Sequence, residues 1–411
     1  MTAPQTSRAP LPSPVLDATV LEGLVRRDVE RRFARRPTGV VVSPYRICPL
    51  GAHSDHQGGT VLGMAITAYS TLAFAPSDSS ELAVIRGETG EEARFDLLDP
   101  LAGRSTGGWD EYLRGCAALL RDRLPRSPRG LVGSVRGSLP EAGLSSSASV
   151  DLAYLTALAA ANELELEGRA LAVLAMRVER EVLGLSCGLL DPATIVGARR
   201  DHLLRIDCRS ERWEALESGA EMPPYRILVA FSGETRTLTA TGFNDRVAEC
   251  RQAAGLLAQR AGRGELERLG DLPLDEVEEG LAHLPPHLAG RARHFSGEAR
   301  RVAAGIAAWR AGELATFGRL MDDSCRSSIE CYECGSPAIV DLHRTLSQCP
   351  GVLGNRFSGG GYGGCCVALV HAAEAEEALG AVAGRYRRLR PELGERARVF
   401  LVDSEDGLRR R

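Results

Sequence analysis

One stretch of the sequence constrains the fold more than any other: a glycine and serine loop that leads directly into an apolar helix. It reads PEAGLSSSASVDLAYLTAL, from Pro140 to Leu158. The first N–H groups of a helix lack partners within the helix, and its dipole makes that end positive, so such a loop can bind phosphate. A serine-rich helix cap without a ligand would look the same. The candidate phosphate contacts are Gly143, Leu144, Ser145, Ser146, Ser147, Ala148 and Ser149.

The basic residues narrow the possible chemistry, because all 50 of them are arginine and the chain has no lysine. A Walker lysine, a Schiff-base lysine and a lysine general base are therefore excluded. A nucleotide would have to be held by backbone amides, hydroxyls, arginine or a metal ion. With 54 acidic residues the net charge is 50 − 54 = −4, which argues against nucleic acid as the main partner.

The cysteines and the N-terminus indicate a cytoplasmic protein. The eleven cysteines are scattered and odd in number, so reduced thiols are expected. Cys331 and Cys334 form a lone CxxC, for which packed thiols are expected rather than zinc. Residues 1–15 are rich in Pro and Ser and lack the apolar segment of a signal peptide, so we expect a flexible arm. No apolar run is long enough to span a membrane, and no membrane partner is expected.

The first half of the chain predicts a sheet followed by helices. Runs of β-branched residues bounded by Gly, Pro and Ser predict strands over 38–87. Strands first, with helices packed on one face, are typical of an α+β fold. A first domain is therefore predicted over 16–221. Apolar spacing predicts helices over 16–33, 109–124, 149–162 and 170–183.

A second domain is predicted over 222–411. A proline pair precedes the strand-like RILVAF and marks the boundary. Strands are expected again from Cys365 and from Arg398. Helices are predicted over 244–260, 296–311, 312–321 and 373–386.

Two further stretches are rich in glycine and polar residues. NRFSGGGYGGCCVAL, from Asn355 to Leu369, allows backbone amides to approach a ligand closely, although a glycine turn between strands would look similar. SPYRICPLGAHSDHQGG, from Ser43 to Gly59, brings one Arg, two His and one Asp into a loop after a strand. Polar groups packed so densely usually line a site.

In this order, the three stretches resemble the signature motifs of the GHMP kinases, which bind ATP without a Walker lysine. The resemblance covers most of the chain. It implies a two-domain fold with the active site between the domains. The N-terminal domain would be like domain 2 of ribosomal protein S5, and the C-terminal domain would be a ferredoxin-like α/β domain.

The stretch from Ser43 to Gly59 is similar to the sugar-recognition motif of galactokinases, in which an Arg precedes Gly-Glu-His-Thr-Asp and a Gly pair. This chain has Ala52 where galactokinases have the Glu that bonds the 6-hydroxyl of the sugar. A carboxylate at C6 would be repelled by a Glu, and Ala52 removes that repulsion. RICPLGAHSDHQGGTV, with the later FSG and FNDRVAEC, resembles the galacturonokinases of plants.

The resemblance therefore implies an ATP-dependent sugar 1-kinase that converts D-galacturonate to α-D-galacturonate 1-phosphate. The alternatives are a galactokinase or another sugar 1-kinase, acting on arabinose or glucuronate, and a sugar sensor without catalysis. The stretch from Glu179 through GLSCGLLDP resembles a galactokinase segment and carries the catalytic aspartate of that family onto Asp191. Retention of Asp191 and Arg46 argues against the sensor. Asp191 would accept the proton of the anomeric hydroxyl or stabilise the transition state. Arg46 would hold Asp191 ionised and offset the developing charge.

By the same resemblance, ATP requires Mg²⁺, with Ser146 and Glu179 as ligands. Ser145 or Ser147 could exchange roles with Ser146, and a solvated helix face is the expected place for Glu181. Trp109 could lie near the nucleotide or be a core aromatic. The protein could be a monomer or a homodimer.

The remaining expectations concern the sugar. His53 and Asp55 would bond its ring hydroxyls, although His53 could be structural. Gly359 and Gly360 would close over its reacting end. Phe243 stands where related kinases have a tyrosine that contacts the substrate. The cation for a C6 carboxylate could be Arg236, by its position only, or His56.

Overall fold

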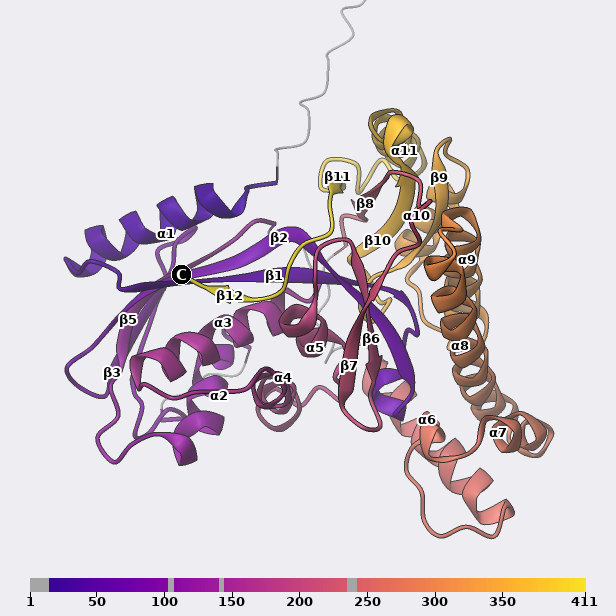
Figure 1. Cartoon of the computed structure of the whole chain (residues 1–411), viewed down its shortest axis with the longest axis horizontal. Helices are drawn as coiled ribbons and strands as arrows, with labels where there is room; N and C mark the ends of the chain where they lie inside the picture. Colours follow the sequence, from indigo (N-terminus) through magenta and orange to yellow (C-terminus); the bar gives the residue numbers. More distant parts are fainter. Residues whose placement is uncertain (1–14, 103–106, 140–143, 235–241) are drawn as a thin grey trace, which may run out of the picture.

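The structure is a computed structural model that describes residues 15–102, 107–139, 144–234 and 242–411 (Figure 1). These residues form two sheets and the helices that pack on them. The predicted N-terminal arm, residues 1–15, lies outside the described residues except for its last position.

The first sheet has the strand order β12-β1-β2-β5-β3-β4, and β6 pairs with β2 and β7 with β6. β3 and β5 are parallel, whereas the other neighbouring strands are antiparallel. Its strands are β1 (Gly39–Leu50), β2 (Thr60–Pro76), β3 (Glu81–Arg86), β4 (Glu92–Asp96), β5 (Leu131–Gly137), β6 (His202–Asp207), β7 (Arg212–Glu217) and β12 (Arg409–Arg410).

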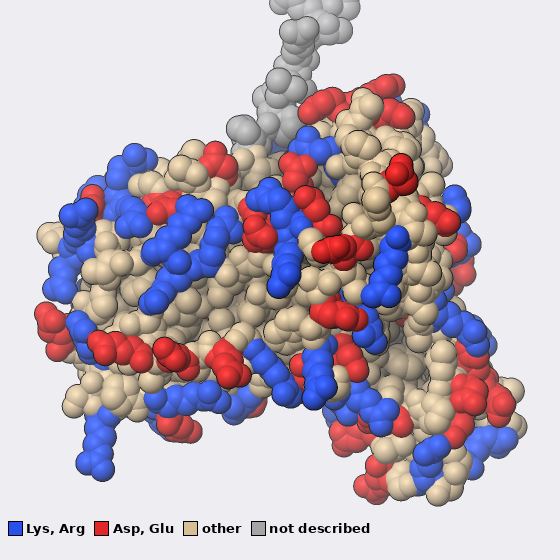
Figure 2. All heavy atoms as spheres, viewed as in Figure 1, with Lys and Arg blue, Asp and Glu red and all other residues tan. Residues whose placement is uncertain are grey.

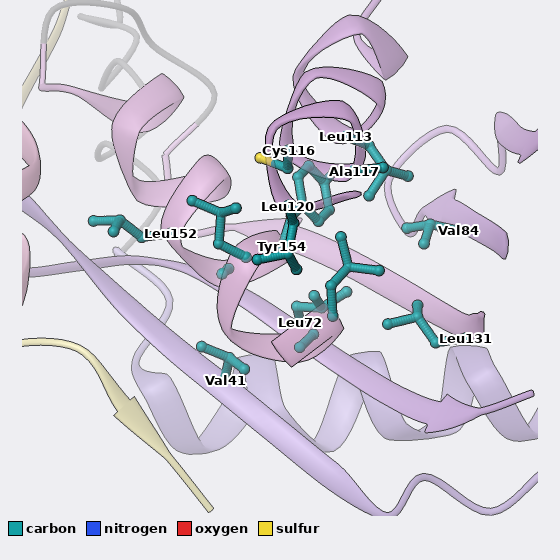
Figure 3. Packing of buried hydrophobic residues seen from close by; sticks show 14 of the residues in the cluster. Val41, Leu72, Val84, Leu113, Cys116, Ala117, Leu120, Leu131, Leu152 and Tyr154 are labelled. Atoms are coloured by element: carbon teal, nitrogen blue, oxygen red, sulfur yellow. The ribbon is translucent and has the colours of Figure 1, made fainter. Parts of the chain in front are cut away.

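Helices cover both faces of this sheet. Alternation along β1 turns Val40 and Val42 to one face, where α1 (Ala18–Phe33) packs, and Val41 to the other. Against Val41 pack α2 (Asp110–Leu120), α3 (Ser146–Ala161) and α4 (Gly168–Arg177), and Figure 3 shows this core. The prediction that helices pack on one face is therefore wrong for α1, whose apolar stripe needs a strand face of its own.

The second sheet has the order β11-β8-β10-β9, and every neighbouring pair is antiparallel. Its strands are β8 (Tyr225–Phe231), β9 (Val352–Phe357), β10 (Cys365–His371) and β11 (Arg398–Val402). Ile227 and Val229 share a core with Ile47 and Met64 of the first sheet, so the two sheets pack against each other. Leu228 of β8 faces the opposite core, beneath α10 (Pro337–Ser347) and α11 (Ala375–Leu389).

In the chain, one of the remaining helices lies between β5 and β6, and the others lie between β8 and β9. They are α5 (Leu190–Gly197), α6 (Phe243–Arg260), α7 (Leu274–Gly280), α8 (Pro286–Arg310) and α9 (Leu314–Glu330). α8 begins ten residues before the predicted 296, because Pro286 occupies a first-turn position that suits proline. α9 also runs past the predicted 321. The long α8 and α9 pack side by side along one end of the molecule (Figure 1).

The end of the chain returns to the first sheet. Arg409 and Arg410 pair with Val42 and Val41 of β1, and the N–H of Arg411 donates to the carbonyl of Val40 at 2.8 Å. The segment that begins at 222 thus contributes β12 to the sheet of the preceding segment. The division of domains at 221 and 222 stays a prediction.

The surface carries basic and acidic side chains interspersed on the face shown in Figure 2. Among the ion pairs of the described residues is that of Arg300, whose side chain is mostly exposed, with Glu278. All eleven cysteines lie among the described residues as free thiols. Within the described ranges, no helix has the length and apolar character needed to cross a bilayer.

Candidate active site

The three sequence motifs meet in one cleft of about 370 Å³ between the two sheets. Arg46 comes from β1, and the loop that follows β1 contributes Ala52 and His53. The start of α3 contributes Ser145–Ser147, and the loop between β9 and β10 contributes 358–364. Residues more than 300 positions apart therefore share one site.

Arg46 and Asp191 form the ion pair in the cleft. Arg46 Nε donates to Asp191 Oδ1 at 2.6 Å and Nη2 donates to Oδ2 at 2.7 Å, so the pair is bidentate. Arg46 Nη1 donates to Ser358 Oγ at 3.3 Å. Burial opposes the charge on Arg46, but Asp191 outweighs it and raises the pKa of the guanidinium. Asp191, in the first turn of α5, is 23% exposed and so remains reachable from the cleft.

Ser145 connects this pair to the phosphate loop. Its φ of 58° is left-handed, and its side chain makes no capping bond to α3. The hydroxyl donates instead to Asp191 Oδ2. Ser146 and Ser147, the first residues of α3, line the cleft, so the positive end of the helix opens onto it.

The other predicted phosphate contacts have buried side chains. Leu144 and Ala148 are core residues, and Ser149 Oγ donates to the carbonyl of Ser43 at 2.9 Å. The side chains of these three residues hold the loop in place and do not line the cleft. Gly143 lies outside the described residues.

Glu179 faces the cleft from a π-helical turn over Val178–Val182, which continues α4. Its side chain is buried, and the Ser147 hydroxyl donates to it. Burial, together with the nearby Asp191, raises the pKa of Glu179. Ser146 stays the predicted hydroxyl ligand of magnesium, and Ser147, which could exchange roles with it, is the serine that bonds Glu179. Glu181 is half exposed and pairs with Arg177.

Hard oxygen donors at this point fit a magnesium ion. Glu179 is a buried acid beside Asp191, and a cation would offset their repulsion. Mg²⁺ commonly keeps waters and phosphate oxygens as its other ligands, so one carboxylate and one hydroxyl suffice. In the described part of the chain, no group of three His, Cys, Asp or Glu side chains could hold a metal by itself.

The loop after β1 forms the opposite end of the cleft. His53, with a φ of 58°, stacks on Tyr332 with ring centroids 4.1 Å apart and lies 3.5 Å from Cys334 Sγ. Burial, and then the nearby His294 and Arg356, lower the pKa of His53 well below its usual value. His53 is therefore neutral.

Ala52 and Asp55 belong to the same loop. The carbonyl of Ala52 lies 2.9 Å from Nε2 of His294, which fixes the backbone where the methyl group lines the cleft. Burial, and then the charge of Asp191, raise the pKa of Asp55. Gly188 lies against Asp55, and a Cβ at Gly188 would be 2.3 Å from Asp55 Oδ2.

Of the two predicted cations for a substrate carboxylate, only His56 lies among the described residues. His56 does not line the cleft, and burial lowers the pKa of His56 to about 3, so the ring carries no charge. The prediction of His56 as a cation is therefore wrong. Its Nε2 instead lies 3.1 Å from the hydroxyl of Tyr332. Arg236 lies outside the described residues.

The remaining predicted residues are divided between the cleft and the core. Gly359, Gly360 and Phe243 line the cleft, and the Phe243 ring is 6.4 Å from that of His53. Trp109 precedes α2 and packs against the first core. Tyr112, one helical turn later, lines the cleft instead. A nucleotide contact by Trp109 stays a prediction.

Arg356 is a cleft residue that was not predicted from the sequence. This arginine of β9 is 1% exposed, yet it lines the cleft. Its Nε donates to the carbonyl of Phe357 and its Nη1 to Ser324 Oγ, both at 3.0 Å. The available signal was its position in NRFSGGG, directly before the glycine loop.

A carboxylate held by an arginine, a helix N-terminus and a glycine loop together suit transfer of a phosphoryl group to a hydroxyl. Two family models match the chain: the N-terminal domain of GHMP kinases over residues 111–198, and the C-terminal GHMP kinase domain over residues 306–388.

Similar proteins include a galacturonokinase of Arabidopsis thaliana, 40% identical over 86% of this chain and 88% of the relative. A galactokinase of a Roseiflexus species is 32% identical over 94% of this chain and 97% of its own. The crystal structure of Lactococcus lactis galactokinase with galactose superposes with a TM-score of 0.85, at 26% identity, over 95% of this chain and 99% of that one. By these matches, the chain belongs to the GHMP kinases.

Proposed function

We propose that this protein is an ATP-dependent sugar 1-kinase that phosphorylates the anomeric hydroxyl of D-galacturonate to give α-D-galacturonate 1-phosphate. The observation that carries the kinase proposal is the bidentate pair of Arg46 and Asp191 beside the N-terminus of α3. The substrate proposal is supported by Ala52 in the cleft and by the 40% identity to a galacturonokinase.

In this proposal Asp191 takes the proton of the anomeric hydroxyl. That oxygen forms a bond to the γ-phosphorus of ATP as the bond to the bridging oxygen breaks, and ADP leaves. Arg46 and Ser145 together engage both oxygens of Asp191. The Ser145 hydroxyl donates to Asp191 Oδ2, and the sugar hydroxyl can replace it there. Arg46 would then continue to orient the carboxylate.

The nucleotide phosphates would lie between the start of α3 and the glycine loop. Since the chain has no lysine, the backbone N–H groups of these segments and the hydroxyl of Ser146 would supply the contacts. Ser146 and Glu179 would hold Mg²⁺. Its chemistry there is to neutralise the charge of the phosphates.

The sugar would lie at the other end of the cleft, against Ala52, His53 and Asp55. A methyl group at position 52 presents no charge to C6, so a carboxylate is not repelled there. Asp55 would accept from ring hydroxyls. Neutral His53 can donate one hydrogen bond or accept one.

A coupled assay of ADP release with ATP and Mg²⁺ tests the proposal. D-galacturonate, D-galactose, D-glucuronate and L-arabinose are compared by kcat/KM. We expect D-galacturonate to be preferred at least tenfold. A preference for D-galactose would make the chain a galactokinase and contradict the role of Ala52. If no sugar is turned over but one binds by calorimetry, the protein is a sensor.

A further inference from the structure

The cleft contains two buried arginines, and an ion pair satisfies one of them. Arg46 is neutralised by Asp191. Arg356 is 1% exposed, lines the same cleft and forms no ion pair with any carboxylate in the described part of the chain. Its two hydrogen bonds, to Phe357 and Ser324, go to uncharged oxygens. Burying an unpaired guanidinium is costly, so a ligand that carries an anion would be strongly favoured beside it.

The surroundings of Arg356 do not supply that anion. Glu298 interacts with it electrostatically, but Glu298 Oε2 accepts from the N–H of Gly51 at 2.6 Å and Oε1 from Arg301 at 2.7 Å. Arg301 therefore already balances the charge of Glu298. His53 and His294 also lie near Arg356, but a histidine ring carries no negative charge in its neutral or its protonated form. Among the described residues, Arg356 therefore has no carboxylate of its own to pair with.

Arg356 belongs to the sugar end of the cleft. It interacts with His53, Cys48 and Cys334, all near the loop that carries Ala52. Arg46 is among the charges that shift the pKa of Glu179, at the phosphate end, and Arg356 is not. The acceptor sugar, rather than ATP, is therefore the source of the missing anion.

We propose that Arg356 is the specificity residue that binds the C6 carboxylate of a uronate substrate, opposite Ala52. This inference rests on the proposed function, because it assumes a sugar acid as acceptor. Ser324 and the carbonyl of Phe357 hold the guanidinium in place, so its remaining N–H groups are oriented before the sugar arrives. The planar fork of an arginine matches the two oxygens of a carboxylate.

The test is Arg356→Gln, which keeps an amide donor and removes the charge. The readout is the ratio of kcat/KM for D-galacturonate to that for D-galactose, with the KM for ATP as a check on the fold. Losing one partner of a buried charge pair should lower this ratio about 100-fold or more. Arg344→Gln is the matched control, because Arg344 is 69% exposed, and it should leave the ratio unchanged.

Each outcome decides the inference. An unchanged ratio overturns it, whatever happens to the total activity. A higher KM for ATP with both sugars slowed equally would assign Arg356 to phosphate and also overturn it. If the wild-type protein does not phosphorylate D-galacturonate, the proposed function itself has failed, and that is seen before any variant is made.

A second variant covers the case in which Arg356→Gln does not fold. Ser324→Ala removes the hydroxyl that holds Nη1 and leaves the charge in place. We expect the KM for D-galacturonate to rise severalfold, with the KM for D-galactose unchanged. Equal changes for both sugars would indicate a structural role only and overturn the inference.

Discussion

The two buried arginines of the cleft are in opposite electrostatic states. Arg46 is paired with Asp191 through two hydrogen bonds. At the sugar end, Arg356 is as deeply buried but is held by neutral oxygens alone. A paired arginine orients a catalytic carboxylate, whereas an unpaired one is available for an anion of the substrate. The difference teaches that the neighbours of an arginine, more than its burial, decide its role.

The largest effect is expected where the pair of Arg46 and Asp191 is broken. Asp191→Asn should lower kcat by about 1000-fold, because an amide cannot take the proton of the sugar hydroxyl. Sugar binding, measured by calorimetry, should change far less than kcat.

Asp122→Asn is the control for this change, since the side chain of Asp122 is 93% exposed. A kcat for Asp191→Asn within tenfold of wild type would show that Asp191 neither accepts the proton nor stabilises the transition state.

The next largest effect is expected when a mutation introduces a carboxylate that can pair with Arg356. Ala52→Glu would place a carboxylate at the sugar end, where it repels a sugar acid and competes for Arg356. Ala52→Gln has the same size without the charge. Because a buried charge pair is at stake, kcat/KM for D-galacturonate should be about 30-fold lower in the Glu variant than in the Gln variant. Equal values in the two variants would mean that position 52 does not face C6.

A smaller effect is expected when Glu179, the buried acid beside Asp191, loses its charge. Glu179→Gln should raise the Mg²⁺ concentration that gives half-maximal activity by about tenfold, since a carboxylate ligand is lost. Glu181→Gln, two residues away on a half-exposed side chain, should not change it. If both variants require the same Mg²⁺ concentration as wild type, Glu179 is not a ligand.

The preference for D-galacturonate over D-galactose is not expected to change with pH. This constancy would sharpen the contrast between Arg46 and Arg356. Burial lowers the pKa of His53 well below its usual value and that of His56 to about 3, so neither gains a proton between pH 8 and pH 6. Arginine stays charged over that range. The preference for D-galacturonate over D-galactose should therefore be constant. A preference that rises as the pH falls through about 6.5 would mean that a histidine binds the carboxylate.

The predictable part of the molecule is the part that local sequence encodes. Apolar spacing predicts α1, and β-branched runs predict β8 and β10, because these elements bury one stripe or one alternating face. The start of α8 was missed although Leu288, Ala292 and Phe295 are buried at helical spacing, because the pair Pro285 and Pro286 before them indicates a turn.

The site was only partly predictable for a related reason. The family resemblance brought Arg46 and Asp191 together although they are 145 positions apart. The position of Arg356 before the glycine loop was the only signal for it among 50 arginines, and its burial without a carboxylate partner is visible only in the fold. His56 was misjudged because burial, which the sequence does not show, removes its charge.

The pairing of β12 with β1 has a consequence for how the chain is made. In the strand order of the first sheet, β1 would be an open edge without β12. β1 leaves the ribosome early, while Arg409 and Arg410 leave it only after the whole second sheet has been synthesised. The nascent protein therefore exposes an unprotected strand edge throughout most of translation, the kind of edge that invites pairing with other chains. A lesion that truncates the protein before residue 409 would make that temporary hazard permanent.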